Sequence, residues 1–187
     1  MTDRSTSVRH AKGTNLIELI KALRVHQRMR PIEGLSGAAQ SLLDERILVS
    51  DWYPLEPFLE LLKVTYDRLL GRNPERALQV GVAGSTVALQ TTYRAYIHHG
   101  DPAGSVLAMR HIWRAFFDFG DVKANLEPDG SVRFVLTGYP DIPPVHAALI
   151  TAWSVAAARL AGSEKAAVDI LEAPWDGVDR LVYRCSF

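Results

Sequence analysis

Cysteine and a bias toward one sign of charge are both missing from this sequence. Cys185 is the single cysteine among 187 residues, so the chain forms no internal disulfide and offers no cysteine-based metal site. Lys and Arg number 21, as do Asp and Glu, whereas a domain that binds nucleic-acid phosphates carries a basic stripe. We therefore expect a protein of the reducing cytoplasm that has no nucleic-acid partner.

Long apolar runs are missing as well. No stretch of about 18 apolar residues occurs, which excludes a membrane-spanning helix. The segment Met1–Lys12 is polar and contains no apolar core of the kind that a signal peptide has. Hydrophobic residues make up 48% of the chain and charged residues 22%, a balance that is typical of a globular domain with one core.

Sequence signatures of catalysis are also absent. No Gly-X-Ser-X-Gly elbow occurs, and Gly81–Ser85 lacks the preceding strand and the Gly-Lys-Ser/Thr of a phosphate-binding loop. His98 and His99 are neighbours that point about 100° apart on a helix, so they cannot chelate one metal ion. His111 and His146 each stand alone, without a haem-binding motif. We expect no cofactor, no metal and no enzymatic activity.

Residues that begin and end helices give the clearest structural signal. Asn73-Pro74 and Asp101-Pro102 each place a capping side chain before a proline that suits the first helical turn. Gly100 and Gly120 suit the left-handed residue that ends a helix. Together with apolar residues at helical spacing, these signals predict helices over residues 16–30, 36–47, 55–70, 74–99 and 102–119.

After Gly120 the apolar spacing changes to every second residue, which predicts strands. The alternation predicts a hairpin within residues 121–138, and a second hairpin within 166–187 follows a helix over about 143–161. This order predicts an α+β fold in which an N-terminal helical layer packs on an antiparallel sheet built from two C-terminal hairpins. We expect strands only in these hairpins.

The domain organisation follows from the same patterns. We expect a single α+β domain over residues 14–187, because one periodic pattern follows another without a linker or a low-complexity segment. Residues 1–13 are rich in Ser, Thr and Arg, and we expect them to form a flexible N-terminus.

Small residues recur three or four positions apart within the helix predicted over residues 74–99. Each glycine costs about 1 kcal/mol of helix propensity relative to alanine, and the close approach of another helix would offset this cost. That helix belongs either to the same chain or to a second copy, and we predict a homodimer through this stripe. Its members are Ala77, Gly81, Gly84, Ser85 and Ala88.

Aromatic residues gather on the predicted helices and on the first hairpin. Such residues either fill a dry core or line a pocket for an apolar small molecule, and the sequence leaves both interpretations open. Arg94, Arg110 and Arg114 are the candidate polar groups of such a pocket. The predicted pocket residues are Tyr93, Trp113, Phe116, Phe134 and Trp153.

Several short motifs resemble those of a family of bacterial proteins of unknown function that is best known from myxobacteria. The resemblance extends from about Lys12 to Phe187, and its motifs lie where helices and strands begin or end. They are Trp52-Tyr53-Pro54, Gly100-Asp101-Pro102, Trp113, Phe117-Asp118-Phe119-Gly120 and Gly138-Tyr139-Pro140.

That family is similar to a superfamily of haem nitric-oxide-binding domains, vinyl-reductase-type sensor domains and transport-particle (TRAPP) subunits of Golgi traffic. The resemblance implies helices on an antiparallel sheet and a role in binding, sensing or scaffolding. The Tyr-x-Ser-x-Arg motif that grips the haem propionates is not matched, since the nearest segment is Thr92–Ala95. Cys185 matches neither the clustered cysteines of the sensor domains nor the acylated helix cysteine of the transport subunits.

These arguments predict a non-catalytic regulatory or scaffolding module that takes part in signalling. We expect it to bind a protein partner or a small apolar molecule. The alternative is a haem, gas or other small-molecule sensor domain, and a third interpretation is an enzyme without a recognisable motif.

Overall fold

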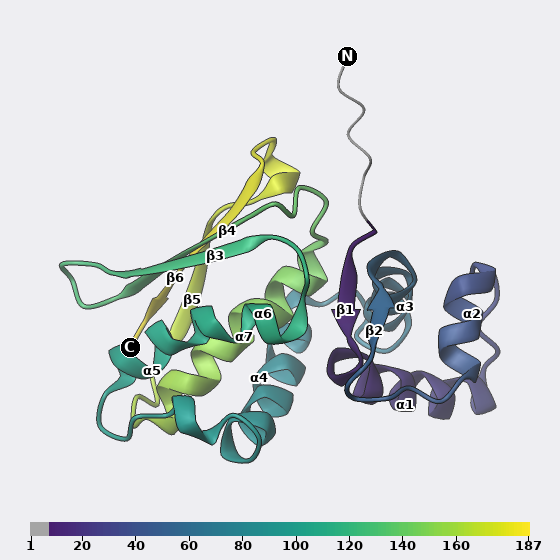
Figure 1. The fold of residues 1–187 in the computed structure, drawn as a ribbon, viewed down its shortest axis with the longest axis horizontal. Helices are drawn as coiled ribbons and strands as arrows, with labels where there is room; N and C mark the ends of the chain where they lie inside the picture. Colours follow the sequence, from purple (N-terminus) through teal and green to yellow (C-terminus); the bar gives the residue numbers. More distant parts are fainter. Residues whose placement is uncertain (1–7) are drawn as a thin grey trace. The chain divides into compact units, whose positions relative to one another are not determined.

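The computed structural model describes residues 8–187, whose contacts group them into two compact units (Figure 1). The first unit comprises the described chain up to Leu69 together with Arg114–Phe119, and the second comprises Leu70–Trp113 and Gly120–Phe187. The single domain expected over residues 14–187 stays a prediction. Residues 1–7 of the expected flexible N-terminus lie outside the described part of the chain.

The first unit is mainly helical. Apolar residues of α1 at helical spacing, such as Leu16, Ile20 and Leu23, are buried, as are Leu43 of α2 and Leu61 of α3. The Ser36 hydroxyl accepts from the amide of Ala39 and so caps α2. The unit contains β1 (His10–Lys12), α1 (Gly13–Met29), α2 (Gly37–Asp44), β2 (Trp52–Pro54) and α3 (Leu55–Arg68).

The pairing of β1 with β2 departs from the sequence analysis, which expected strands only in the C-terminal hairpins. The two strands are antiparallel, with His10 opposite Pro54 and Lys12 opposite Trp52. Each has only three residues, too few for an alternating pattern to emerge. Gly13 follows β1 directly, and a Cβ there would collide with the Leu48 carbonyl oxygen. Residues 10–12 are therefore ordered into a sheet.

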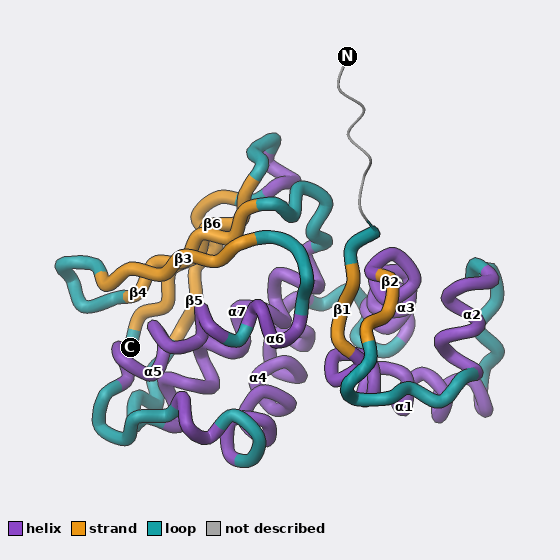
Figure 2. Tube along the Cα trace, in the orientation of Figure 1, coloured by secondary structure: helices purple, strands orange, loops and turns teal. Residues whose placement is uncertain are grey.

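The second unit contains a four-stranded antiparallel sheet in the order β3-β4-β6-β5 (Figure 2). The α+β prediction and both predicted hairpins are thereby confirmed. The sheet consists of β3 (Asp121–Leu126), β4 (Val132–Thr137), β5 (Ala167–Glu172) and β6 (Arg180–Ser186), with η3 (Pro174–Asp176) between β5 and β6. The helical elements are α4 (Pro74–Gln90), η1 (Arg94–Tyr96), α5 (Pro102–Ala108), η2 (Met109–His111) and α7 (Pro144–Leu160).

Helix α7 forms the centre of the second unit. It contacts α4, α5 and the strands β5 and β6, so almost every face of the helix is covered. Its sequence is accordingly mostly apolar, and most of its residues are buried, many of them alanines. One face of the sheet carries buried side chains such as Phe134, Leu136, Leu181 and Tyr183. In β4 they alternate with partly exposed residues, whereas in β6 Val182 on the other face is buried as well.

The helix predicted over residues 74–99 is shorter than expected, because α4 ends at Gln90. The hydroxyl of Thr91 donates to the Val87 carbonyl oxygen at 2.8 Å, and the Thr91 backbone has left the helical region, with φ −116° and ψ −92°. A threonine that competes for the backbone in this way favours a helix end. The short 3-10 turn η1 follows, and His98 and His99 are exposed beyond it.

The helix predicted over residues 102–119 is also wrong, because it is divided into α5, η2 and α6 (Trp113–Phe116). Residues 114–119 make contacts of the first unit, and the helical segment ends at Phe116. The Asn15 side-chain amide donates to the Phe116 carbonyl oxygen at 3.2 Å, and Asp118 Oδ1 accepts from the His10 amide at 2.7 Å. Tertiary contacts here override a helical pattern.

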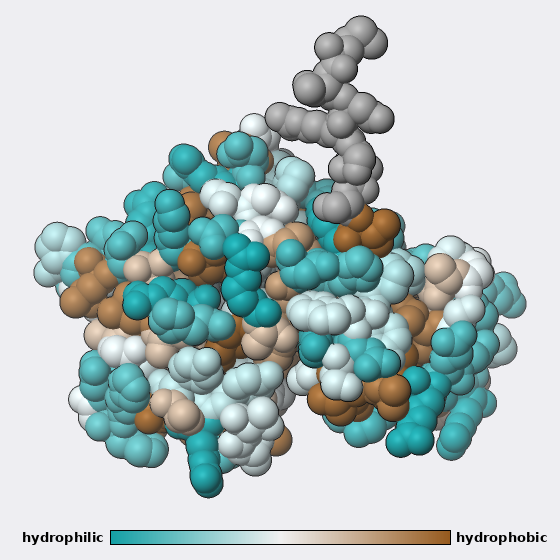
Figure 3. All heavy atoms as spheres, in the orientation of Figure 1, coloured by the Kyte–Doolittle hydropathy of each residue, from teal (hydrophilic) through white to brown (hydrophobic). Residues whose placement is uncertain are grey.

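The surface is mostly polar. In the face shown in Figure 3, hydrophilic side chains predominate and apolar ones occur in small groups. Scattered exposed apolar residues are normal for a folded protein. Within residues 8–187, no helix is both long enough and apolar enough to cross a membrane.

Candidate functional site

The aromatic cluster of the second unit consists of Tyr93, Tyr96 and Trp153. Tyr93 and Trp153 meet edge to face with ring centroids 5.8 Å apart, and the Tyr96 ring lies 6.4 Å from that of Tyr93. All three side chains are half-buried. Such rings present apolar faces together with hydroxyl and indole N–H groups, the mixture that small-molecule sites use.

The Tyr93 hydroxyl of this cluster stays protonated at neutral pH. Burial, and secondarily the neighbouring Tyr96, raise the pKa of Tyr93 above its ordinary value of 10.0. A neutral hydroxyl both donates and accepts hydrogen bonds. The cluster is therefore suited to an uncharged polar group on an otherwise apolar ligand.

The other predicted pocket residues lie elsewhere. Trp113 is 5% exposed, and its ring centroid lies 6.4 Å from that of Tyr139. Phe134 is 1% exposed and stacks on Tyr183 with centroids 4.7 Å apart. These two residues are part of the core of the second unit, whereas Phe116 makes the contacts of the first unit. The structure brings two of the predicted pocket residues, Tyr93 and Trp153, into contact. The pocket itself stays a prediction.

Two buried hydrogen bonds join α7 to its surroundings in the second unit. His146 Nδ1 lies 2.8 Å from the Tyr139 hydroxyl, and the Ser154 hydroxyl lies 3.2 Å from that of Tyr183. Burial lowers the pKa of His146 to about 3 and raises the pKa of Tyr183, so His146 and Tyr183 are neutral at pH 7. Sequence reasoning interpreted His146 as a half-buried side chain and missed Tyr139 as its partner.

The stripe of small residues on α4 is divided between two environments. A Cβ on Gly81 would lie 2.7 Å from Ala152 Cβ on α7, so this glycine permits close packing within the chain. Ala77 and Ser85 are buried, whereas a Cβ on Gly84 would meet nothing within 4 Å. The sequence left open whether the stripe packs against a helix of the same chain or of a second copy. Gly81 packs against a helix of the same chain. The homodimer stays a prediction.

Two kinds of reactive site, a metal site and an ionised thiol, were considered from the side chains of residues 8–187, and neither is formed there. Among residues 8–187, no group of three or more His, Cys, Asp or Glu side chains is arranged to hold a metal. Cys185 is buried, and burial raises its pKa to about 12, so the thiol does not ionise at neutral pH.

Comparison with known proteins identifies the fold. No family model and no curated protein matches the sequence. Among solved structures, an H-NOX protein from S. oneidensis in the Fe(II)NO ligation state is similar, with a TM-score of 0.63 and 12% identity over 94% of this chain and 98% of that chain. A mutant H-NOX protein from T. tengcongensis has a TM-score of 0.61 and 15% identity over 94% and 97% of the two chains.

A third similar structure is an unliganded Fe(II) form of a mutant H-NOX protein from K. algicida. Its TM-score is 0.60, with 8% identity over 94% of this chain and 95% of that chain. At such identities the likeness shows the fold alone. The chain thus has an H-NOX-like α+β fold, and its place in the myxobacterial family stays a prediction.

Proposed function

We propose that this chain is a non-catalytic sensor domain that binds a small molecule. The likeness to H-NOX structures supports this proposal, because it extends over 94% of this chain and 94–99% of the similar chains. One of those structures shows an H-NOX protein in the Fe(II)NO ligation state, and another concerns haem distortion in the H-NOX family. A small-molecule sensor is therefore better supported than the scaffolding role that headed the sequence-based expectations.

Haem itself would need an axial ligand, and we tested the histidines for one. An axial imidazole presents one ring nitrogen to the iron while a hydrogen bond holds the other. His146 Nδ1 is held by the Tyr139 hydroxyl, but the His146 side chain is 4% exposed and enclosed in the core. His98, His99 and His111 are exposed to solvent.

The remaining two histidines belong to the first unit. His10 Nδ1 pairs with Asp118 Oδ2 at 2.7 Å. His26 Nε2 is buried without a hydrogen-bond partner, but it lies in the last turn of α1, between Arg24 and Arg28 in sequence. None of the described histidines combines a free ring nitrogen with an open apolar surrounding, so the residues present do not fit haem.

We assign the ligand to the aromatic cluster instead. All three side chains are half-buried, and Tyr93 contacts both Tyr96 and Trp153, so an apolar molecule can pack on their rings without unfolding the core. Trp153 is carried by α7, which also carries His146 and Ser154. A ligand that contacts Trp153 therefore acts on the helix whose buried hydrogen bonds reach Tyr139 and Tyr183.

Tryptophan fluorescence and thermal shift test this assignment. We expect at least one member of a panel of fatty acids and aromatic compounds to raise the melting temperature and change the emission of the wild type. Trp153→Ala abolishes both effects, whereas Trp175→Ala, which removes a tryptophan that is 45% exposed in η3, retains the thermal shift. A thermal shift that survives in Trp153→Ala would refute the assigned site.

A haem or gas sensor is the second candidate, favoured by the haem and the Fe(II)NO state of the similar structures. Expression with ample haem supply separates the two candidates by absorption. We expect no Soret band, because none of the described histidines is placed as an axial ligand. An intense Soret band that disappears in His146→Ala would establish haem binding in spite of the closed site.

A further inference from the structure

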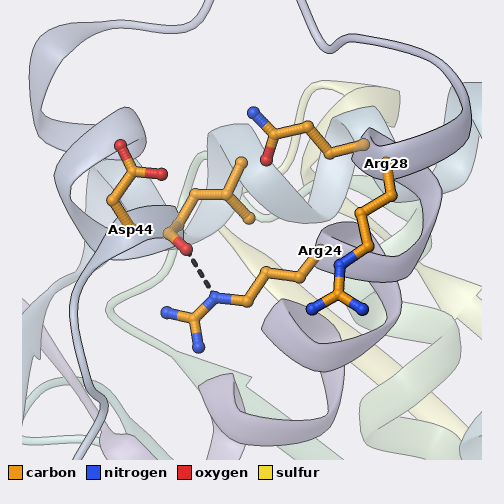
Figure 4. Close-up of a pocket in the computed structure, with 5 residues that line it drawn as sticks. Arg24, Arg28 and Asp44 are labelled. Atoms are coloured by element: carbon orange, nitrogen blue, oxygen red, sulfur yellow. Dashed lines mark hydrogen bonds between the residues drawn. The ribbon is translucent and has the colours of Figure 1, made fainter.

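A cavity lies in the first unit, between the C-terminal turn of α1 and the end of α2 (Figure 4). Its volume is about 280 Å³. Polar and charged side chains provide most of its wall, unlike the aromatic cluster of the second unit. The lining residues are Arg24, Gln27, Arg28, Leu43 and Asp44.

The Arg24 guanidinium is fixed by the end of α2. Its Nε donates to the Leu43 carbonyl oxygen at 2.6 Å, and its Nη2 donates to the Glu45 carbonyl oxygen. These carbonyls belong to the last turn of a helix, which has no further amides to bond them. Arg24 therefore holds α2 against α1 and stays in place with its positive charge uncompensated by a carboxylate.

Arg28 lies one turn further along α1, on the same face as Arg24. Within residues 8–187 it has no hydrogen-bond or ion-pair partner, and neither Arg24 nor the nearby Arg30 forms an ion pair. Like charges four residues apart destabilise a helix. An anion between the two guanidinium groups would remove this repulsion.

The opposite wall limits what kind of anion fits. Asp44 accepts a hydrogen bond from Gln40 Nε2 at 2.8 Å, which holds its carboxylate. Figure 4 shows the guanidinium groups of Arg24 and Arg28 ending on one side of the pocket and the Asp44 carboxylate on the other. A ligand with one compact oxyanion group fits the cationic side, and its far end must tolerate a carboxylate.

We propose that this cavity binds the oxyanion group of a small metabolite, a phosphate or a carboxylate. Guanidinium groups match such oxyanions in planar geometry and donate charge-assisted hydrogen bonds. Arg28 provides the mobile cation, Arg24 the fixed one, and Gln27 an amide donor. The volume lies just below the range for ligand pockets, about 300–1,000 Å³, so a compact anion fits better than a nucleotide. The site goes beyond the proposed sensing function and does not depend on it.

Calorimetric titration of the full chain with inorganic phosphate, and separately with succinate, tests this site. The anion that binds more tightly, phosphate or succinate, identifies the oxyanion class. Arg28→Gln is expected to weaken binding roughly tenfold, because one charge-assisted interaction is lost. Asp44→Asn is expected to tighten binding by roughly threefold, because a like charge at the opposite wall is removed. The control Arg30→Gln, at the residue directly after α1 and outside the cavity lining, leaves the affinity within a factor of two of the wild-type value.

Chemical shifts of the Gln27 side-chain amide locate the bound anion independently of the variants. Far-ultraviolet circular dichroism checks that each variant is folded. The proposal is overturned if neither anion binds the wild type at millimolar concentration. It is equally overturned if Arg30→Gln weakens binding as much as Arg28→Gln, since that result describes non-specific attraction to a basic helix end.

Discussion

Arginines behave differently in the two units of this chain. On the sheet of the second unit, Arg180 pairs with Glu172 at 2.6 Å and Arg184 with Asp169 at 3.5 Å. At the end of α1 in the first unit, Arg24 bonds only carbonyl oxygens, and Arg28 has no partner among residues 8–187. The arginines of the sheet have carboxylate partners, whereas two arginines without a carboxylate partner beside a cavity are candidates for binding an anion.

The buried polar groups of the second unit extend this comparison. The Tyr139–His146 and Ser154–Tyr183 pairs satisfy one another inside the core, as buried polar groups must. They hold α7 to its surroundings, and the half-buried aromatic cluster is the part of the unit to which we assign ligand binding. Substitutions in the core, on α4 and at the surface test this difference, and the largest expected change in stability comes first.

Trp113→Ala should cost roughly 3–5 kcal/mol in the free energy of unfolding, because it leaves a cavity in the core. Trp153→Ala should cost clearly less, since that side chain is half-buried. Urea denaturation of both variants measures the difference. Equal losses would place Trp153 in the dry core and remove the argument for an aromatic binding site.

Acidification should destabilise the protein through His146. Its folded pKa of about 3 lies below the unfolded value near 6.5, so only the unfolded chain takes up this proton between those values. Stability is therefore fully present above pH 6.5 and falls by about 1.4 kcal/mol per pH unit as the pH drops toward 3.

Denaturation at several pH values tests this slope. His146→Gln should flatten it, whereas the control His111→Gln, at an exposed position, should retain it. A slope that is unchanged in His146→Gln would assign the acid sensitivity to other groups.

Gly81→Ala and Gly84→Ala form a matched pair on α4. The Gly81 substitution should destabilise by about 1–3 kcal/mol, because its Cβ meets Ala152 at 2.7 Å. The Gly84 substitution meets nothing within 4 Å and should stabilise by about 0.5–1 kcal/mol through helix propensity. Thermal denaturation gives both signs, and stabilisation by Gly81→Ala would contradict the close packing of α4 on α7.

Arg24→Gln and Arg28→Gln should separate structure from binding in the first unit. The former leaves carbonyls of Leu43 and Glu45 without a donor and should cost about 1 kcal/mol. The latter removes no contact within residues 8–187, so its melting temperature should equal that of the wild type. A clear loss of stability in Arg28→Gln would show that this side chain has a structural role.

Local signals predicted much of the fold. The Asn73 side chain accepts from the Arg76 amide, as expected of a cap before Pro74. Gly120 has a positive φ directly before β3, although the helix that it was predicted to end already ends at Phe116. The alternation after Gly120 correctly predicted both hairpins. These features depend on residues only a few positions apart.

Features that depend on distant residues could not be predicted. The end of the helical segment at Phe116 reflects contacts of Phe116 and Asp118 with Asn15 and His10, about one hundred positions away. The partner of His146 lies in the turn after β4, where a lone tyrosine gives no signal of a buried hydrogen bond. The arginine cavity also needed structure, because only the packing of α1 beside α2 turns a basic helix end into a site.

Mass spectrometry of the purified protein under native and denaturing conditions tests the central claim most directly. The account predicts a native mass that exceeds the denatured mass by a small organic molecule, retained by Trp175→Ala and lost in Trp153→Ala. Identical native and denatured masses for the wild type, together with no thermal shift from any compound in the panel, would contradict a small-molecule sensor.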